Sequence, residues 1–174
     1  MRLLQFSTSH YCRKARLALG YKQIPYTVEN LTPGLHVLRL RPLTGLTTLP
    51  VLLPEVAAHP LAIADSTQIL HFLQTYQPEP SYYLADAQLQ SQAWMLEDWL
   101  DESIGVATRF VYYDFRAKEG KALDASLMSQ AVIQVVRRQY GINGATVDLA
   151  KLRLERAIAE LERRWQSPYL VGAQ

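Results

Sequence analysis

The feature that most constrains the fold is a break at residues 77–80, where the sequence Gln-Pro-Glu-Pro divides the chain. Before this break, short apolar segments rich in β-branched and aromatic residues alternate with segments of helical periodicity. After it, no segment has the pattern of a strand. Proline has no backbone N–H and disfavours helix at the residue before it, so the break is typical of a linker. We therefore predict two domains, residues 1–77 and residues 84–174.

The first part of the chain predicts a four-stranded mixed sheet with helices, in the order βαβ-α-ββα. Residues 2–6 and 25–29 have the composition of strands, and they flank a helix over residues 10–21 that Ser9 is suited to cap. A strand, a helix and a strand within about thirty residues favour a parallel crossover. The pattern then predicts a short helix over residues 33–41, a loop over 42–48, two antiparallel strands over 49–54 and 59–63, and a helix over 65–76.

The second part predicts helices alone, over residues 86–116, 126–140 and 147–165. The first of these carries aromatic residues at roughly helical spacing, which we interpret mainly as core packing: Trp94, Trp99, Phe110, Tyr112 and Tyr113. The apolar residues assigned to the inner side of the last helix are Leu149, Leu152, Ile158, Leu161 and Trp165. An all-helical domain therefore follows the α/β domain.

Composition excludes several classes of protein. Hydrophobic residues make up 49% and charged residues 20%, which is typical of a folded globular protein. A net charge of +2 with scattered basic residues does not indicate nucleic acid. No run of about 18 apolar residues occurs, so we predict no membrane span. The single cysteine, Cys12, fits a reducing compartment, and we expect the cytoplasm. The histidines lack metal-ligand spacing, so no metal is predicted.

Three short segments combine residue types that suit an anionic, peptide-like ligand. The first is Ser9 to Cys12 at a strand-to-helix junction, where a helix N-terminus stabilises an anion such as a thiolate. The second is Leu49–Pro50, where a cis proline would free the Leu49 backbone to pair with an extended peptide. The third is Asp65–Ser66 at the start of a helix, where the terminus binds a carboxylate and the aspartate an ammonium.

Together these segments resemble the glutathione-binding set of the thioredoxin, glutaredoxin and glutathione-transferase superfamily. The sequence SHYCRKARLALGYKQIPYT resembles the first-helix signature of cytosolic glutathione transferases. TLPVLLPE is similar to their cis-proline strand, and LAIADSTQILHFLQTYQPEP to their strand, turn and helix with an acid–serine pair. The resemblance covers residues 1–80, while EDWLDE and SPYLVG in the other half are compatible with family helices. It implies a thioredoxin-like domain followed by an all-helical domain.

The resemblance also implies roles for individual residues. Ser9 takes the position at which serine-type members place a hydroxyl that donates a hydrogen bond to the glutathione sulfur. Leu49, before the presumed cis Pro50, would pair with the cysteinyl backbone of glutathione. Asp65 and Ser66 would bind the ammonium and carboxylate of its γ-glutamyl group.

Other contacts stay open at the level of sequence. The glycine end of glutathione usually meets a basic or amide side chain, and Arg39 and Arg41 are both candidates. The candidates for an acceptor pocket are Tyr11, Phe110 and Tyr113. Ser9 can also be read as a helix cap alone, and Ser7 is its nearest competitor. Cys12, in the position of a resolving cysteine, is interpreted as a half-buried helix residue.

The sequence departs from the family pattern in three places. The loop over residues 42–48 is longer than the common form and lacks the usual Lys or Gln before the Leu-Pro pair. The first cysteine of the two-cysteine redox motif is missing, so dithiol oxidoreduction is not expected. The chain stops at SPYLVGAQ, where family members continue, which predicts a short member or a truncated chain.

The resemblance therefore predicts a detoxifying enzyme that conjugates the glutathione thiolate to small hydrophobic electrophiles and forms a homodimer. Glutathione is expected as co-substrate, with no metal. Two alternatives stay open. One is a glutathione-binding or protein-interaction module with little transferase activity, and the other is a glutathione-dependent peroxidase or reductase.

Overall fold

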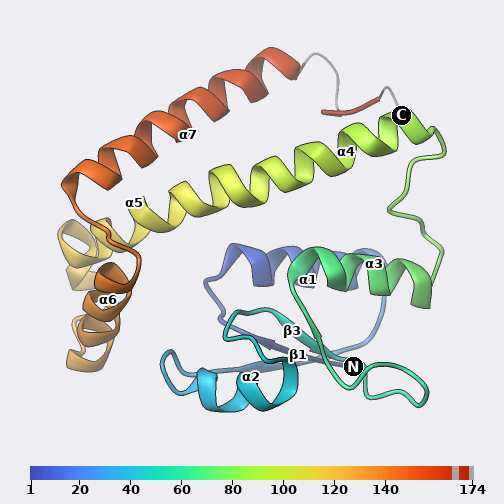
Figure 1. The fold of residues 1–174 in the computed structure, drawn as a ribbon, viewed down its shortest axis with the longest axis horizontal. Helices are drawn as coiled ribbons and strands as arrows, with labels where there is room; N and C mark the ends of the chain where they lie inside the picture. Colours follow the sequence, from blue (N-terminus) through green and yellow to red (C-terminus); the bar gives the residue numbers. More distant parts are fainter. Residues whose placement is uncertain (166–168, 173–174) are drawn as a thin grey trace. The chain divides into compact units, whose positions relative to one another are not determined.

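A computed structural model describes residues 1–165 and 169–172 of the chain. The chain divides into two compact units, Met1–Tyr83 and Leu84–Gln174. The first unit contains a sheet with helices and the second contains helices (Figure 1). Of the quoted segment SPYLVG, Ser167 and Pro168 lie outside the described residues. Within the described part of the chain, no helix is both long and apolar enough to cross a membrane.

The first unit contains the mixed four-stranded sheet that the sequence predicts. Its strands are β1 (Arg2–Gln5), β2 (Thr27–Asn30), β3 (Val51–Leu53) and β4 (Ile63–Ala64), in the spatial order β2-β1-β3-β4. Strand β1 pairs in parallel with β2 and antiparallel with β3, and β3 pairs antiparallel with β4. This confirms the predicted parallel crossover and the predicted hairpin.

Helices cover both faces of this sheet. Helix α1 (His10–Tyr21) and helix α3 (Ser66–Tyr76) lie on one face, and α2 (His36–Thr44) lies on the other (Figure 1). Because side chains alternate along a strand, Leu3 faces one layer of the core and Leu4 the other. The first layer contains Leu3, Ala15, Ala18, Leu19, Ile24, Leu52, Ile69 and Leu73. The second contains Leu4, Leu40, Val51 and Leu53.

Several predicted boundaries in this unit are wrong. Helix α2 continues through Pro42 to Thr44, so the predicted loop over residues 42–48 is shorter, and Gly45 ends the helix with a φ of 72°. Pro42 has no N–H to donate to the carbonyl of Leu38, so α2 lacks one internal hydrogen bond at this point. Strand β2 starts at Thr27, whose N–H donates to the carbonyl of Met1, whereas Pro25 has no N–H to donate. Strand β4 has two residues, and residues 59–62 are not part of it.

The segment after α3 is tied to the first unit by Lys22, a buried side chain of the α1 C-terminus. Its Nζ donates to the side-chain oxygen of Gln74 at 2.7 Å and to the carbonyls of Gln77 and Pro78 at 2.7 and 3.0 Å. The same Nζ lies 4.3 Å from the ring centre of Tyr82, whose hydroxyl donates to a carbonyl of α1. The predicted linker residues 77–80 are therefore packed against α1 and α3.

The second unit consists of helices, as predicted, but its long first helix is interrupted. Helix α4 (Ala87–Trp99) leads into a π-helical segment, η1 (Leu100–Gly105), and then into α5 (Val106–Ala117). A 3₁₀ segment, η2 (Glu119–Leu123), was not predicted. Helices α6 (Leu127–Gln139) and α7 (Gly144–Arg164) follow. Asp86 caps α4 and Ser126 caps α6, so the predicted starts of these helices hold.

The inner side predicted for α7 is wrong. Its buried residues are Val147, Ala150 and Ala157, whereas Leu149, Leu152, Ile158 and Trp165 are exposed and Leu161 is only partly buried. Small residues let α7 approach α5 closely, and periodicity does not decide between two apolar stripes on one helix.

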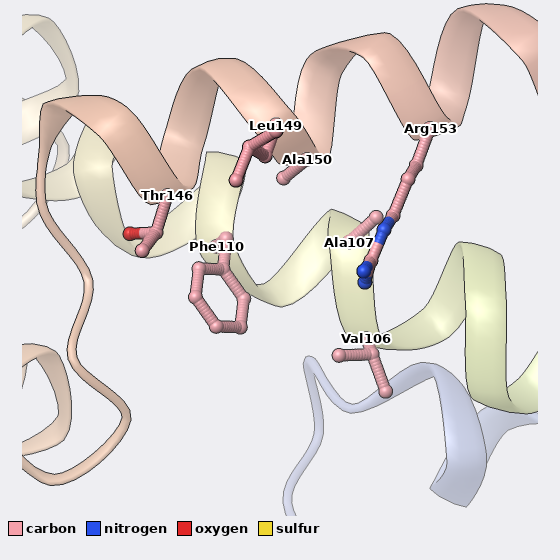
Figure 2. Close-up of a pocket in the computed structure, with 7 residues that line it drawn as sticks. All are labelled: Val106, Ala107, Phe110, Thr146, Leu149, Ala150 and Arg153. Atoms are coloured by element: carbon pink, nitrogen blue, oxygen red, sulfur yellow. The ribbon is translucent and has the colours of Figure 1, made fainter.

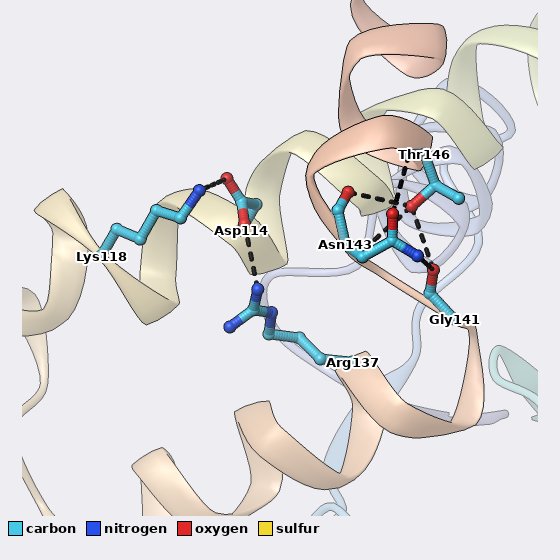
Figure 3. A network of polar contacts seen from close by, with 6 residues as sticks. All are labelled: Asp114, Lys118, Arg137, Gly141, Asn143 and Thr146. Atoms are coloured by element: carbon cyan, nitrogen blue, oxygen red, sulfur yellow. Dashed lines mark hydrogen bonds and ion pairs between the residues drawn. The ribbon is translucent and has the colours of Figure 1, made fainter.

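Polar contacts fix both ends of the connection between α6 and α7 (Figure 3). Buried Asp114 of α5 accepts from Lys118 at 2.8 Å and from Arg137 of α6 at 3.2 Å. Asn143 and Thr146 form a capping box at the start of α7. The contact between Asp114 and Arg137 therefore links α5 to α6, and the capping box fixes where α7 begins.

Candidate functional site

The register of the sheet brings the three predicted segments to one end of the first unit. Gln5 pairs with Asn30, Leu4 pairs with Val51, and Val51 pairs with Ala64. The C-terminal ends of β1 and β4 and the N-terminal end of β3 therefore lie at the same sheet end. The loop to Ser9, the Leu49–Pro50 pair and Asp65–Ser66 all adjoin this end. Polar groups from three separate stretches of sequence can thus meet one ligand.

Ser9 caps α1. Its backbone is extended, with φ −73° and ψ 127°, and its Oγ accepts a hydrogen bond from the N–H of Cys12 at 3.3 Å. A hydroxyl has one donor as well as its acceptor lone pairs, so the capping bond itself does not use the O–H. The hydroxyl and the α1 N-terminus together suit a negatively charged sulfur. Ser7, the competing residue, is exposed, and its carbonyl accepts from Arg16 at 3.4 Å.

Cys12 has no exposed surface, so it is more buried than predicted. Burial raises the pKa of its thiol, although a hydrogen bond with Ser9 acts in the opposite direction. A buried thiol with a raised pKa stays neutral near pH 7 and is a poor nucleophile. The interpretation of Cys12 as a helix residue fits this environment.

The Leu49–Pro50 peptide bond is cis, as the sequence suggested. Pro50 is buried, while Leu49 is partly exposed and precedes the residues that pair with β1. The Leu49 backbone therefore lies just beyond the β1–β3 ladder, at the sheet end that the other two segments adjoin.

Asp65 and Ser66 form the start of α3. Both capping bonds, from the N–H of Thr67 at 3.0 Å and of Gln68 at 3.1 Å, end on Oδ1 of Asp65, so Oδ2 is not used by them. Asp65 has a φ of 75°, an unfavourable value for a residue with a Cβ. Such strained conformations cluster at ligand-binding sites. Ser66 is buried in the first turn, where unpaired N–H groups suit a carboxylate.

Lys14 is a candidate that sequence reasoning missed. Its Nζ donates to Oγ1 of Thr67 at 3.0 Å, which brings a cation from α1 to the first turn of α3. The two residues are 53 positions apart, and each lies in an ordinary helical pattern. Only the packing of α1 on α3 identifies the pair.

The two arginines proposed for the glycine end differ in environment. Arg39 lies 3.7 Å from the carboxylate of Glu29 on β2, and Arg41 is exposed in the last turn of α2. A further candidate was missed at the start of α2. The His36 ring packs edge-on against Phe6, the residue that follows β1, with 4.9 Å between ring centres.

The acceptor candidates are distributed over both units. In the first, the rings of Tyr11 and His10 lie 4.0 Å apart. In the second, Phe110 lines a cavity of about 220 Å³ between α5 and α7 (Figure 2). Tyr113 lies one turn later on α5 and is absent from the cavity lining, and burial raises the pKa of its hydroxyl. Among the described residues, no group of three or more His, Cys, Asp or Glu side chains could hold a metal ion.

Solved structures share this fold at low sequence identity. A glutathione S-transferase from Methylobacterium radiotolerans, in complex with glutathione sulfonate, has a TM-score of 0.71 and 22% identity over 99% of this chain and 71% of that chain. The β-etherase LigF from a Sphingobium strain has a TM-score of 0.72 and 19% identity, over 98% and 75% of the two chains. A glutathione S-transferase from Methylobacillus flagellatus with glutathione bound has a TM-score of 0.68 and 19% identity, over 99% of this chain and 74% of that chain.

The first unit also has a sequence match at the level of a protein family. No curated protein matches the chain. Residues 3–81 match the family model described as the glutathione S-transferase N-terminal domain, which covers all four strands and α1 to α3. The first unit is therefore similar, in sequence and in its four-stranded sheet, to the N-terminal domain of glutathione S-transferases.

Proposed function

We propose that the chain binds glutathione at the sheet end defined by Ser9, Leu49–Pro50 and Asp65–Ser66, and conjugates its thiolate to a small hydrophobic electrophile. The observation that carries the proposal is the strand register, because it brings the hydroxyl of Ser9, the backbone of Leu49 and the carboxylate of Asp65 to one end of the sheet. Two of the structures of similar fold hold glutathione or its sulfonate.

The ligand would lie in an extended conformation across this end of the sheet. The backbone of its cysteinyl residue would pair with Leu49. Its γ-glutamyl carboxylate would accept hydrogen bonds at the start of α3, beside Ser66, while its ammonium would donate to Asp65. Lys14 adds positive charge at the same helix start. His36, Arg39 and Arg41 are the candidates for the glycine carboxylate.

Binding in this pose would place the glutathione sulfur at Ser9. A hydrogen bond from Oγ and the α1 N-terminus favour the thiolate over the thiol. Lowering the thiol pKa by about two units from about 8.5 corresponds to about 2.7 kcal/mol in favour of the thiolate. With an aryl chloride, the sulfur would form a C–S bond, chloride would leave with the electron pair of the C–Cl bond, and the thiol proton would pass to solvent.

The test compares two serines that cap helices. Ser9→Ala removes the cap and the donor to sulfur, whereas Ser126→Ala removes a similar cap from α6 alone. Conjugation of glutathione to a chlorodinitrobenzene is measured between pH 5.5 and 9. We expect Ser9→Ala to lower kcat/KM at pH 6.5 by about tenfold or more, because the apparent pKa of the bound thiol returns towards about 8.5.

Ser126→Ala is expected to keep the wild-type pH profile. An unchanged profile in Ser9→Ala would contradict the role of Ser9. Binding of glutathione without turnover of any acceptor would favour the alternative of a binding module. The absence of glutathione binding would contradict both the transferase and the binding-module hypotheses.

A further inference from the structure

The α5–α7 cavity combines an apolar lining with one cationic side chain. Residues 106, 107 and 110 line it from α5, and residues 146, 149, 150 and 153 line it from α7. The α7 positions recur at intervals of three and four, so they form one face of that helix. The two buried alanines, Ala107 and Ala150, leave the space between the helices open (Figure 2).

Arg153 supplies the only charge in this lining. Its side chain extends from α7 towards Val106 and Ala107, while the Phe110 ring lies towards the start of α7 (Figure 2). A residue pairs most readily with neighbours three or four positions away on a helix. For Arg153 these neighbours are Leu149, Ala150, Arg156 and Ala157, so α7 offers it no carboxylate. Within the described residues, its guanidinium has neither a hydrogen bond nor an ion pair.

We propose that this cavity binds a small aromatic carboxylate, with its ring against Phe110 and its carboxylate on Arg153. An apolar cavity favours a flat hydrocarbon ring, and a guanidinium forms paired hydrogen bonds with a carboxylate. The volume of about 220 Å³ restricts the ligand to one or two rings.

This proposal concerns the second unit alone and is separate from the proposed transfer reaction. Binding itself does not require glutathione or Ser9. The experiment therefore measures binding of an unreactive probe to the whole chain, without glutathione. Loss of transferase activity and loss of this binding are separate results.

The probes are 1-naphthoate and its neutral counterpart 1-naphthylmethanol, titrated by calorimetry. We expect Arg153→Gln to weaken naphthoate binding about tenfold, in the range of a charge-assisted hydrogen bond, and to leave naphthylmethanol binding unchanged. Arg153→Lys should recover part of the naphthoate affinity because it restores the charge but not the paired donors. Phe110→Ala should weaken both probes.

Arg156→Gln is the matched control, because Arg153 and Arg156 are both exposed on α7 and only Arg153 lines the cavity. It should bind both probes as the wild type does. The proposal is overturned if the wild type binds neither probe, if Arg153→Gln binds naphthoate as tightly as the wild type, or if Arg156→Gln weakens it equally. Circular dichroism spectra identical to the wild type establish that each variant is folded.

Discussion

At the scale of single residues, the first unit buries two ionisable side chains, Lys22 and Cys12, in different environments. Lys22 has no exposed surface, but the three donors of its ammonium group match three oxygen acceptors. A buried charge is tolerated when its hydrogen bonds are all made, so Lys22 serves to hold residues 77 and 78. Cys12 is equally buried and lies close to Ser9, the proposed sulfur site. Because Cys12 lies so close to Ser9, its part in catalysis has to be tested separately.

Cys12 is predicted to take no part in catalysis. Because burial raises its thiol pKa, the native protein should react slowly with a disulfide reagent at pH 7.5, and the urea-unfolded chain should react at least about a hundredfold faster. Cys12→Ala should keep the wild-type kcat/KM for conjugation within about twofold. Rapid labelling of the native thiol, or loss of activity in Cys12→Ala with a normal circular dichroism spectrum, would contradict this.

The same pKa shift gives a pH dependence of stability. The folded thiol titrates above the ordinary value of 9.0, so between these two pKa values the native state binds more protons than the unfolded state. The contribution to stability is complete below pH 9 and is lost as the pH rises above it. Urea unfolding at pH 8, 9 and 10 should therefore show a steeper loss in the wild type than in Cys12→Ala.

At the scale of elements, capping residues and the lengths of connections were sufficient to predict most helices and strands. Ser9, Asp65, Asp86 and Ser126 each precede a helix and each accepts N–H groups of its first turn, as their residue types suggest. The parallel pair β1–β2 and the hairpin β3–β4 follow from connectivity, because a short crossover gives parallel strands and a short turn gives a hairpin. The pairing of β1 with β3 was not predicted. The site segments could be found because each adjoins an element boundary.

What sequence reasoning missed depends on contacts between distant residues. Lys14 meets Thr67 only because α1 packs against α3. The inner face of α7 is set by its partner α5, which selects the alanines and not the leucines. The predicted helix ends at Arg41, before Pro42, whereas α2 continues to Thr44 and ends at Gly45.

Comparing Asp65 with Asp86 separates the effect of a helix cap on stability from the effect of the Asp65 carboxylate on ligand binding. Asp65 and Asp86 both accept two N–H groups on Oδ1, at distances between 2.8 and 3.1 Å. Alanine at either position should cost about 1 kcal/mol of stability. Only Asp65→Ala should weaken glutathione binding, by about tenfold, because the ammonium of the ligand loses a charged acceptor.

Asp65→Asn refines this test because asparagine keeps the cap but loses the charge. It should retain the stability of the wild type and still bind glutathione more weakly, as measured by calorimetry. Equal weakening in Asp86→Ala would mean that general stability, and not the Asp65 carboxylate, controls the affinity.

At the scale of the whole molecule, apolar side chains remain exposed in both units. Those that are more than seven-tenths exposed are Leu38, Leu61, Met95, Leu123, Leu127 and Met128. Exposed apolar surface favours association when it is contiguous, and a net charge of +2 adds little repulsion between copies. We therefore infer that the chain forms a homodimer.

Sedimentation velocity tests this inference directly. The chain has a mass of 19.8 kDa, and we expect a single species of about twice that mass at micromolar concentration. Leu61→Glu in the first unit and Met95→Glu in the second each place a charge on exposed surface, so neither should affect folding of the monomer. A shift towards monomer in one variant identifies the unit that contributes to the interface, because a buried unpaired charge opposes association. Gln134→Glu, exposed on α6 and polar already, is the control. A wild type that sediments as a monomer at every concentration would contradict the dimer.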